Sequence, residues 1–264
     1  MGKVVLITGG SSGIGKHAAL ALQKAGCTVY EMSRKDSIGL EGIRHIRGDV
    51  TDEAQAAAAV KEVVEREGRL DILINNAGFG ISGAVEFTPP SEARRQFDVN
   101  FFGMVNMNKA ALPIMRQQGG GRIVCMSSVA APIAIPFQAY YSASKAAVRT
   151  YCLALHEEVR PYGVEICVIM PGDIATGFTA ARAKSAEGDD VYGGRISRSV
   201  AVMEHDEQTG MTAEYAGNFV AKIATKKGHK PVVTMGGKYK LFVFLTRLMS
   251  TRLMTFLVGK IYAS

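Results

Sequence analysis

Cysteine is scarce in this sequence, and its few copies lack the spacing that would give them a chemical role. The four cysteines, Cys27, Cys125, Cys152 and Cys167, stand in apolar runs typical of strands or helices. They form no C-x-x-C pair and have no histidine partners at metal-site spacing. The pattern excludes a disulfide framework, and it predicts reduced thiols that pack in a core and no metal site.

Long uninterrupted hydrophobic runs are also absent. Arg247, Arg252 and Lys260 divide the apolar C-terminal segment, residues 238–264, into runs shorter than the roughly 18 residues of a membrane-spanning helix. At the other end, a strand-like run begins at Lys3, which leaves no room for the charged and apolar regions of a signal peptide. These absences predict a cytoplasmic protein.

Acidic residues are fewer than basic ones, and the formal net charge is +7. Such an excess suits nucleic acid, an anionic membrane surface or a polyanionic cofactor. Lysine and arginine are scattered and are not interleaved with aromatic residues, and no nucleic-acid motif is present. We therefore expect no nucleic-acid partner, whereas the cofactor and membrane alternatives both stay open.

The chain has the size and rhythm of one α/β domain spanning residues 1–264. Apolar residues make up 47% and charged residues 21% of the 264 positions, a balance that permits one buried core. Strand-like runs occur at 4–8, 28–32, 43–46, 71–75, 122–127, 164–170 and 231–235. Helical patterns occur at 13–25, 52–67, 91–117, 138–160 and 212–226. This alternation predicts a Rossmann-type, doubly wound parallel sheet of six or seven strands with helices on both faces.

Two segments depart from this rhythm. Residues 173–210 are small, charged and glycine-rich, and they are too long for a plain connector, so we expect an irregular, mobile substrate lid. Residues 238–264 combine apolar and basic side chains. They are compatible with peripheral contact at a membrane interface, but we favour packing over the pocket or against a partner subunit.

The sequence TGGSSGIG, Thr8 to Gly15, follows the first strand and leads directly into a helix. Glycines let the backbone turn tightly and approach a pyrophosphate at the helix N-terminus, and the serine hydroxyls add donors. The strand–turn–helix context makes a ligand-free turn the weaker alternative. The expected cofactor contacts of this turn are Gly9, Ser11, Ser12, Gly13, Ile14 and Gly15.

The end of the second strand bears on the choice between NAD and NADP. By alternation Ser33 faces the adenosine ribose, and the guanidinium of Arg34 suits a 2′-phosphate. The rival interpretation uses Glu31 as the acid that binds the ribose hydroxyl of NAD, with Arg34 in solvent. We favour NADP(H) as the cofactor.

Tyr141 and Lys145 are one helical turn apart, so their side chains emerge on one face. A neighbouring ammonium stabilises a phenolate and brings the phenol pKa toward neutrality, and Lys145 has a second plausible role on the nicotinamide ribose. Such a pair alone is common on surfaces. However, Ser128 follows a strand end, where open α/β sheets bind ligands, while we expect the adjacent Ser127 to turn into the structure.

Taken together, these motifs resemble the short-chain dehydrogenase/reductase family over about residues 3–180. The resemblance implies a catalytic tetrad of Asn100 (in DVNFFG), Ser128, Tyr141 and Lys145, the last two also touching the cofactor. It implies further cofactor contacts at Asp49, Val50, Asn76, Ala77, Gly78, Pro171, Gly172 and Thr176. The implied reaction interconverts a secondary alcohol and a ketone, with Tyr141 moving the proton and Ser128 polarising the oxygen.

Within that family, stretches such as NNAGFGISGAVEFTP and VNFFGMVNMNKAALP are most similar to the 17β-hydroxysteroid dehydrogenase-like branch. This implies a small hydrophobic substrate, a hydroxysteroid or ketosteroid including the bile-acid type, with an acyl-ketone lipid intermediate as the alternative. The expected pocket rim is Phe79, Ile133, Phe137 and Phe178, although each also suits plain core packing.

Two further expectations follow from the resemblance. It suggests a homodimer or homotetramer formed through the two long central helices. A non-catalytic NADP-binding sensor is the alternative of another class, and fold alone does not exclude it. Such a sensor is expected to have a damaged tetrad, whereas all four positions are intact here, which favours an enzyme.

Overall fold

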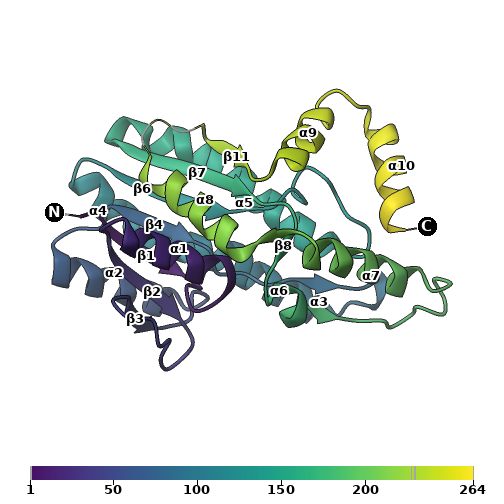
Figure 1. Cartoon of the computed structure of the whole chain (residues 1–264), viewed down its shortest axis with the longest axis horizontal. Coiled ribbons are helices and arrows are strands. Elements are labelled where there is room, and N and C mark those ends of the chain that lie inside the picture. Colours follow the sequence, from purple (N-terminus) through teal and green to yellow (C-terminus); the bar gives the residue numbers. More distant parts are fainter. Residues whose placement is uncertain (1, 227, 229, 264) are drawn as a thin grey trace.

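Within residues 2–226, 228 and 230–263, which the computed structural model describes, seven parallel strands form one central sheet (Figure 1). The strands are β1 (Val4–Thr8), β2 (Thr28–Ser33), β3 (Arg44–Arg47), β4 (Ile72–Asn75), β6 (Gly121–Met126), β7 (Val164–Met170) and β11 (Val232–Thr234). Their order is β11-β7-β6-β4-β1-β2-β3, so it reverses between β1 and β4. The predicted doubly wound sheet is confirmed, and ligands bind beside such a reversal at the carboxyl ends of the strands.

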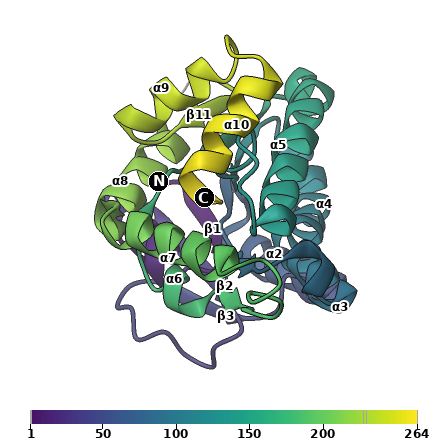
Figure 2. The ribbon, with the colours of Figure 1, turned by 90° about the vertical axis from the view of Figure 1, so that its right-hand side faces the viewer.

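Helices cover both faces of the sheet, as Figure 2 shows for α8 on one side and α4 and α5 on the other. One face carries α1 (Gly13–Lys24) and α8 (Ala213–Thr225). The opposite face carries α2 (Glu53–Glu67), α4 (Gly103–Gln117) and α5 (Ala139–Val159). The strands are apolar throughout because both of their faces are buried under helices.

Alternation along the strands divides the core into two layers. Leu6 packs in the cluster that includes residues of α2, α4 and α5, whereas its neighbour Ile7 packs with residues of α1 and α8. Successive side chains of a strand point to opposite faces, so each strand supplies both layers. Helix α2 is capped at both ends. The Asp52 side chain accepts from Ala54 N at the N-terminus, and Gly68, with φ 73°, ends the helix.

The helix expected over residues 91–117 is interrupted. It consists of α3 (Pro90–Phe97), a π-helical turn (Asp98–Phe102) and α4. The expectation of one regular helix was therefore wrong at its centre, because the 3.6-residue period does not reveal one extra residue in a turn. Such π turns are frequent at functional sites, and this one contains Asn100.

The lid segment contains more regular structure than its composition suggests. It forms β8 (Ile174–Ala175), α6 (Phe178–Ala181), β9 (Ala183–Lys184) and α7 (Arg195–Gln208). Helix α7 buries Ile196, Ser199 and Met203, a helical spacing that the surrounding charges obscured. The expectation of an irregular lid was wrong for this part. Short pieces complete the chain: β5 (Ile81–Ser82), β10 (Met211–Thr212) and the 3₁₀ turns Val85–Phe87 and Arg160–Tyr162.

The C-terminal segment folds into two helices, α9 (Gly237–Leu245) and α10 (Thr251–Tyr262), which stand beside the lid in Figure 1. Arg195 Nε on α7 donates to Ala263 O at 2.6 Å, and Tyr262 Oη donates to Asp206 Oδ2 at 3.3 Å. Among the described residues, no helix is both long and apolar enough to cross a membrane.

Candidate active site

The loops that follow β1 and β4 are joined by hydrogen bonds at the reversal of strand order. Thr8 Oγ1 accepts from Asn76 N and Ala77 N, each at 3.1 Å. Asn76 Nδ2 in turn donates to Thr8 O at 3.0 Å and Gly9 O at 3.1 Å. The glycine turn and the NNAG segment therefore form one rigid floor at the carboxyl edge of the sheet.

The glycine turn has the backbone shape that a dinucleotide requires. Gly9 and Gly13 have φ values of 65° and 52°, which L side chains rarely adopt. A Cβ atom on Gly15 would lie 2.4 Å from Gly9 O and 2.5 Å from Asn76 Nδ2, so only glycine fits. Helix α1 begins directly after Ser11 and Ser12, and the free backbone N–H groups of such a helix N-terminus suit a phosphate.

The segments after β3 and β7 approach the same edge. Asp49 Oδ1 accepts from Thr51 N at 3.0 Å, which orders the turn after β3. Val50 is buried, and a Cβ on Gly103 would lie 2.6 Å from its Cγ2 atom. From the other half of the sheet, Thr176 Cβ lies 3.7 Å from the Cβ position of Gly13. The structure thus brings Thr176 against the phosphate turn, as a shared cofactor site requires.

Pro171 and Gly172 follow β7 and are held from two sides. Pro171 O accepts from Val129 N at 2.9 Å, which ties this segment to the loop after β6. The ring of Tyr239 covers Gly172, because a Cβ there would lie 2.2 Å from that ring. The Tyr239 hydroxyl also donates to Asp173 Oδ2 at 2.6 Å, so the C-terminal segment fixes this part of the site.

The end of β2 has an arrangement that the sequence does not reveal. Glu31 is fully buried, and its Oε1 atom accepts from Ser33 Oγ and lies against His45 Nδ1, both at 2.7 Å. Its Oε2 atom lies beside Gly10 with no hydrogen-bond partner among the described residues. Glu31 therefore belongs to the strand interior, and the exposed residue past the strand end is Arg34.

Helix α5 carries the tyrosine and lysine of the predicted tetrad. Lys145 Nζ donates to Met126 O at 2.9 Å and lies 5.7 Å from the centre of the Tyr141 ring. Ser127 Oγ donates to Lys145 O at 2.8 Å, so Ser127 does turn into the structure. Ser128 remains at the carboxyl edge, where a hydrogen bond links it to Tyr141.

Burial controls the acidity of this pair. It raises the pKa of Tyr141 to about 12, an effect that the hydrogen bond with Ser128 and the charge of Arg182 partly offset. Burial also lowers the pKa of Lys145 to about 8. The expected lowering of the phenol pKa by the Lys145 ammonium is not found here, because Lys145 Nζ is directed to the carbonyl of Met126.

Asn100 sits in the π turn and is buried. Its Oδ1 atom accepts from Phe79 N at 3.0 Å, while Nδ2 donates to Phe79 O at 3.0 Å and to Ser144 Oγ at 3.2 Å. A Cβ on Gly78 would lie 3.1 Å from Asn100 Oδ1 and 3.4 Å from Lys145 Nζ. Asn100 and Lys145 therefore border the same small space beside Gly78.

Of the four expected pocket residues, Phe178 lies nearest to the chemistry. Its ring packs edge-on against Tyr141, with ring centres 5.9 Å apart. Phe137 packs edge-on against Tyr192 of the lid at 5.6 Å. Its φ of 57° makes it the non-glycine residue with a positive φ among those described, and such strain is often stored at ligand-binding sites.

The other two expected pocket residues are placed differently. The Phe79 ring packs under the guanidinium of Arg95 at 4.8 Å and is therefore directed toward α3. Ile133 is partly exposed in the loop after β6. Neither shows a contact with Tyr141 as direct as that of Phe178.

A buried charged group beside Tyr141 was missed by the sequence analysis. Arg182 is 4% exposed and forms a salt bridge with Glu207 of α7, which also accepts from Thr179 Oγ1 at 2.6 Å. The guanidinium lies 5.7 Å from the Phe178 ring, and its Nε and Nη1 atoms have no hydrogen-bond partner among the described residues. No spacing signal distinguishes this arginine from the other charges of the lid.

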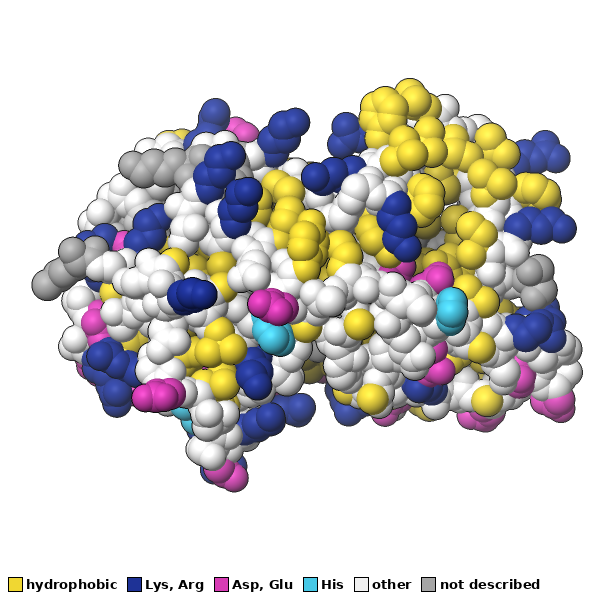
Figure 3. Space-filling view, viewed as in Figure 1, with side chains coloured by type: hydrophobic (Ala, Val, Ile, Leu, Met, Phe, Trp, Pro, Cys, Tyr) yellow, Lys and Arg dark blue, Asp and Glu magenta, His cyan; other side chains and the backbone are white. Residues whose placement is uncertain are grey.

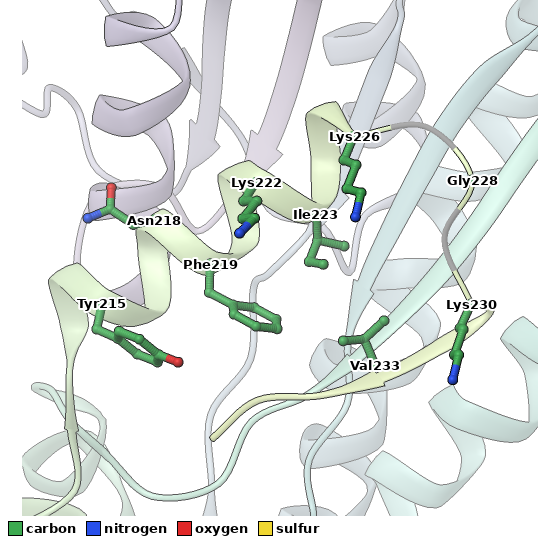
Figure 4. A pocket seen from close by; sticks show the side chains of 9 residues that line it. All are labelled: Tyr215, Asn218, Phe219, Lys222, Ile223, Lys226, Gly228, Lys230 and Val233. Carbon is green, nitrogen blue, oxygen red and sulfur yellow. The ribbon is translucent and has the colours of Figure 1, made fainter. Parts of the chain in front are cut away.

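A separate groove lies between α8 and the edge strand β11 (Figure 4). Its volume is about 580 Å³, and its lining includes Phe219, Ile223 and Val233 with Lys222 and Lys230. None of its lining residues belongs to the predicted site, so this groove is not the candidate active site.

Comparison with known proteins identifies the family. The family model described as short chain dehydrogenase matches residues 3–187. A 3-ketodihydrosphingosine reductase from Bacteroides thetaiotaomicron is 41% identical over 228 residues, 85% of this chain and 84% of that protein. Dehydrogenase/reductase SDR family member 7B from Xenopus tropicalis is 32% identical, covering 97% of this chain and 85% of that protein.

Solved structures agree with this assignment. A short-chain dehydrogenase from Streptomyces avermitilis superimposes with a TM-score of 0.86 at 29% identity, covering 98% of this chain and 96% of the other. ElxO with NADP bound gives a TM-score of 0.77 at 28% identity, covering 91% and 100%. The chain belongs to the short-chain dehydrogenase/reductase family. It is an oxidoreductase that acts on CH–OH and carbonyl groups of a small molecule with a nicotinamide cofactor.

Proposed function

We propose that this enzyme reduces the ketone of a long-chain lipid, such as a 3-keto sphingoid base, with NADPH as the electron donor. The observation that carries the substrate class is the 41% identity, over most of both chains, to a protein named 3-ketodihydrosphingosine reductase. This supports the acyl-ketone lipid alternative over the hydroxysteroid that the sequence favoured. The ring of Phe178 beside Tyr141 provides an apolar wall for such a substrate.

The residues of this chain supply orientation and a proton. Ser128 holds the substrate oxygen, and Tyr141, protonated at neutral pH because burial raises its pKa, delivers a proton to that oxygen during reduction. Lys145 and Asn100 both border Gly78. Asn100 belongs to the path along which the proton moves, and Lys145 also holds the cofactor ribose. The nicotinamide cofactor, when bound at the Gly9–Gly15 turn, supplies the hydride.

The preference for NADP(H) rests on the end of β2. Arg34 is exposed there, where a guanidinium suits a 2′-phosphate. Glu31, the candidate acid for NAD, has its Oε1 atom occupied by Ser33 and His45 in the strand interior.

We also propose a homodimer or homotetramer through α4 and α5, which sedimentation measurements would test.

The activity test follows NADPH oxidation with 3-ketodihydrosphingosine, a 3-ketoacyl ester and a panel of keto- and hydroxysteroids, with NADH in parallel. We expect turnover of the lipid ketones with NADPH and at least about 1000-fold slower turnover by Tyr141→Phe, with unchanged NADPH binding. Steroid turnover without lipid turnover would restore the hydroxysteroid interpretation. Wild-type activity in the Tyr141→Phe variant would refute the assigned proton donor.

A further inference from the structure

The C-terminal hairpin, defined here as residues 236–263 with α9 and α10, exposes an unusual amount of apolar surface. Thirteen large hydrophobic side chains are exposed in the described chain, and eight of them belong to this hairpin. They are Leu241, Phe242, Phe244, Leu248, Leu253, Phe256, Leu257 and Ile261. Figure 3 shows hydrophobic side chains gathered over α9 and α10. A contiguous patch of this kind marks an interaction surface, whereas single exposed residues do not.

The exposed residues follow helical spacing, so they form an outer face. On α10, Leu253, Leu257 and Ile261 recur every four residues and lie along one side of the helix. Val258 of α10 and Val243 of α9 are instead buried against the rest of the protein. The hairpin thus has an inner apolar face that is covered and an outer one that is open.

The charge of the hairpin has one sign. Residues 236–264 contain five basic residues and no aspartate or glutamate. Arg252, Phe256 and Lys260 form an i, i+4, i+8 row beside the apolar stripe, and Lys260 Nζ lies 5.9 Å from the centre of the Phe256 ring. Long basic side chains in such a row lay their stems on apolar surface and reach outward with their charged ends.

These features argue against two other arrangements, a hairpin that spans the membrane and a second copy of the chain on the outer face. Helices of 9 and 12 residues are about 14 and 18 Å long, too short for a hydrocarbon core of about 30 Å. A second copy related by two-fold symmetry would bring together two surfaces that carry basic and no acidic residues, so no salt bridge could form between their hairpins. An anionic lipid surface matches both the apolar face and the charge.

We propose that the outer face of the C-terminal hairpin binds anionic lipid membranes, with its phenylalanine and leucine side chains among the acyl chains and its basic residues at the phosphates. The inner side of the hairpin meets the active site, through Tyr239 on Gly172 and Asp173, and it meets the lid, through Arg195 and Ala263. Membrane docking therefore holds the substrate side of the enzyme at the lipid surface. This inference stands on the hairpin alone and does not rest on the proposed function.

The test measures binding of the full chain to phosphatidylcholine vesicles with and without phosphatidylglycerol, in the absence of substrate and cofactor. The chain contains no tryptophan, so Phe256→Trp provides a single fluorescent reporter on the outer face. Tyr162→Trp is the matched control, because Tyr162 is similarly exposed, at 51% against 59% for Phe256, but lies outside the hairpin. We expect anionic vesicles to shift the fluorescence emission of the tryptophan at position 256 and brominated lipids to quench it. The tryptophan at position 162 should show neither effect.

Two pairs of substitutions separate the apolar and charged contributions. Phe244→Ser with Phe256→Ser is expected to weaken vesicle binding at least about tenfold. Arg247→Gln with Arg252→Gln is expected to reduce the preference for anionic lipid by about fivefold per charge and to remove much of the salt sensitivity. Val85→Ser, which removes an exposed apolar side chain elsewhere, is the control and should bind as wild type does.

Turnover of a soluble short-chain ketone should be unchanged in the hairpin variants, which separates this test from that of the proposed function. The proposal is overturned if the wild type ignores anionic vesicles, or if the double variants bind them as well as the wild type does. It is also overturned if light scattering shows that the hairpin pairs two copies of the chain and that Phe256→Ser dissociates them without affecting lipid binding.

Discussion

At the scale of single residues, the site combines two groups whose charged forms are disfavoured by burial. Lys145 is buried and its pKa falls to about 8, while burial raises the pKa of Tyr141 to about 12. At neutral pH the pair therefore holds a protonated phenol and an ammonium that a modest rise in pH discharges. Sequence spacing predicted the pair but not these environments, because burial depends on the tertiary structure around α5 rather than on local sequence.

The lowered pKa of Lys145 predicts a specific pH dependence of stability. The unfolded chain binds a proton at this lysine up to about pH 10.4, whereas the folded chain releases it from about pH 8. The unfolded state thus binds more protons between these values, so this group makes the folded protein more stable as pH rises. Relative to Lys145→Met, the wild type should gain about 2–3 kcal/mol between pH 7 and pH 10, measured by urea unfolding. A difference that is flat with pH would contradict the buried ammonium.

Arg34 offers a test of cofactor choice at one side chain. Arg34→Ala should weaken NADPH binding about 10- to 100-fold, because a charge-assisted contact to the 2′-phosphate is lost. NADH binding should change little. Titration by isothermal calorimetry measures both affinities, and Lys35→Ala, at the neighbouring exposed position, is the control. Equal loss for both cofactors would show that Arg34 does not read the 2′-phosphate.

Gly15 tests the phosphate turn. Gly15→Ala would place a methyl group 2.4 Å from Gly9 O, so the floor between β1 and β4 must shift. We expect nucleotide affinity to fall about tenfold or more and stability to fall by about 1–3 kcal/mol. Gly259→Ala, in α10 with open space around its Cβ position, should leave affinity unchanged. Tight nucleotide binding by Gly15→Ala would contradict the proposed turn.

At the scale of elements, sequence patterns predicted the strands and most helices but missed what departs from regular periods. The sheet could be predicted because runs such as VVLIT are apolar on both faces and are bounded by turn residues. The π turn at Asn100 could not, since one extra residue leaves the apolar period almost intact. Helix α7 was hidden because its buried positions, Ile196, Ser199 and Met203, include one serine and stand among charges.

The contact between α6 and α7 predicts coupling within the lid. Glu207→Ala leaves the Arg182 guanidinium buried without its carboxylate, which should cost about 3–5 kcal/mol of stability. The substitution should also raise KM more than it lowers kcat, because Glu207 would no longer hold Arg182 against the Phe178 ring. Arg182→Met with Glu207→Leu should recover most of the stability. Urea unfolding and steady-state kinetics measure these effects, and a double variant no more stable than Glu207→Ala would argue against the buried pair.

At the scale of the whole molecule, the candidate site is assembled from distant segments that the topology brings to one edge. The glycine turn, NNAG, Ser128 and Thr176 follow four different strands, and their convergence follows from the parallel order around β1 and β4. Motif order in the sequence was therefore enough to predict that these segments meet at one edge of the sheet. It was not enough for the Arg182–Glu207 pair, because nothing local indicates that two charges of the lid are buried together.

The docking of Tyr239 on Gly172 has a consequence for how the chain can be cut. Because the ring fills the space over Gly172 and its hydroxyl is bonded to Asp173, the C-terminal hairpin is not a detachable appendage. A protease that cleaved before Tyr239 would remove the ring that covers Gly172 in the candidate site, together with the apolar outer face. Limited digestion in this region should therefore abolish turnover of soluble and membrane-borne ketones alike, and lipid vesicles should slow the inactivation.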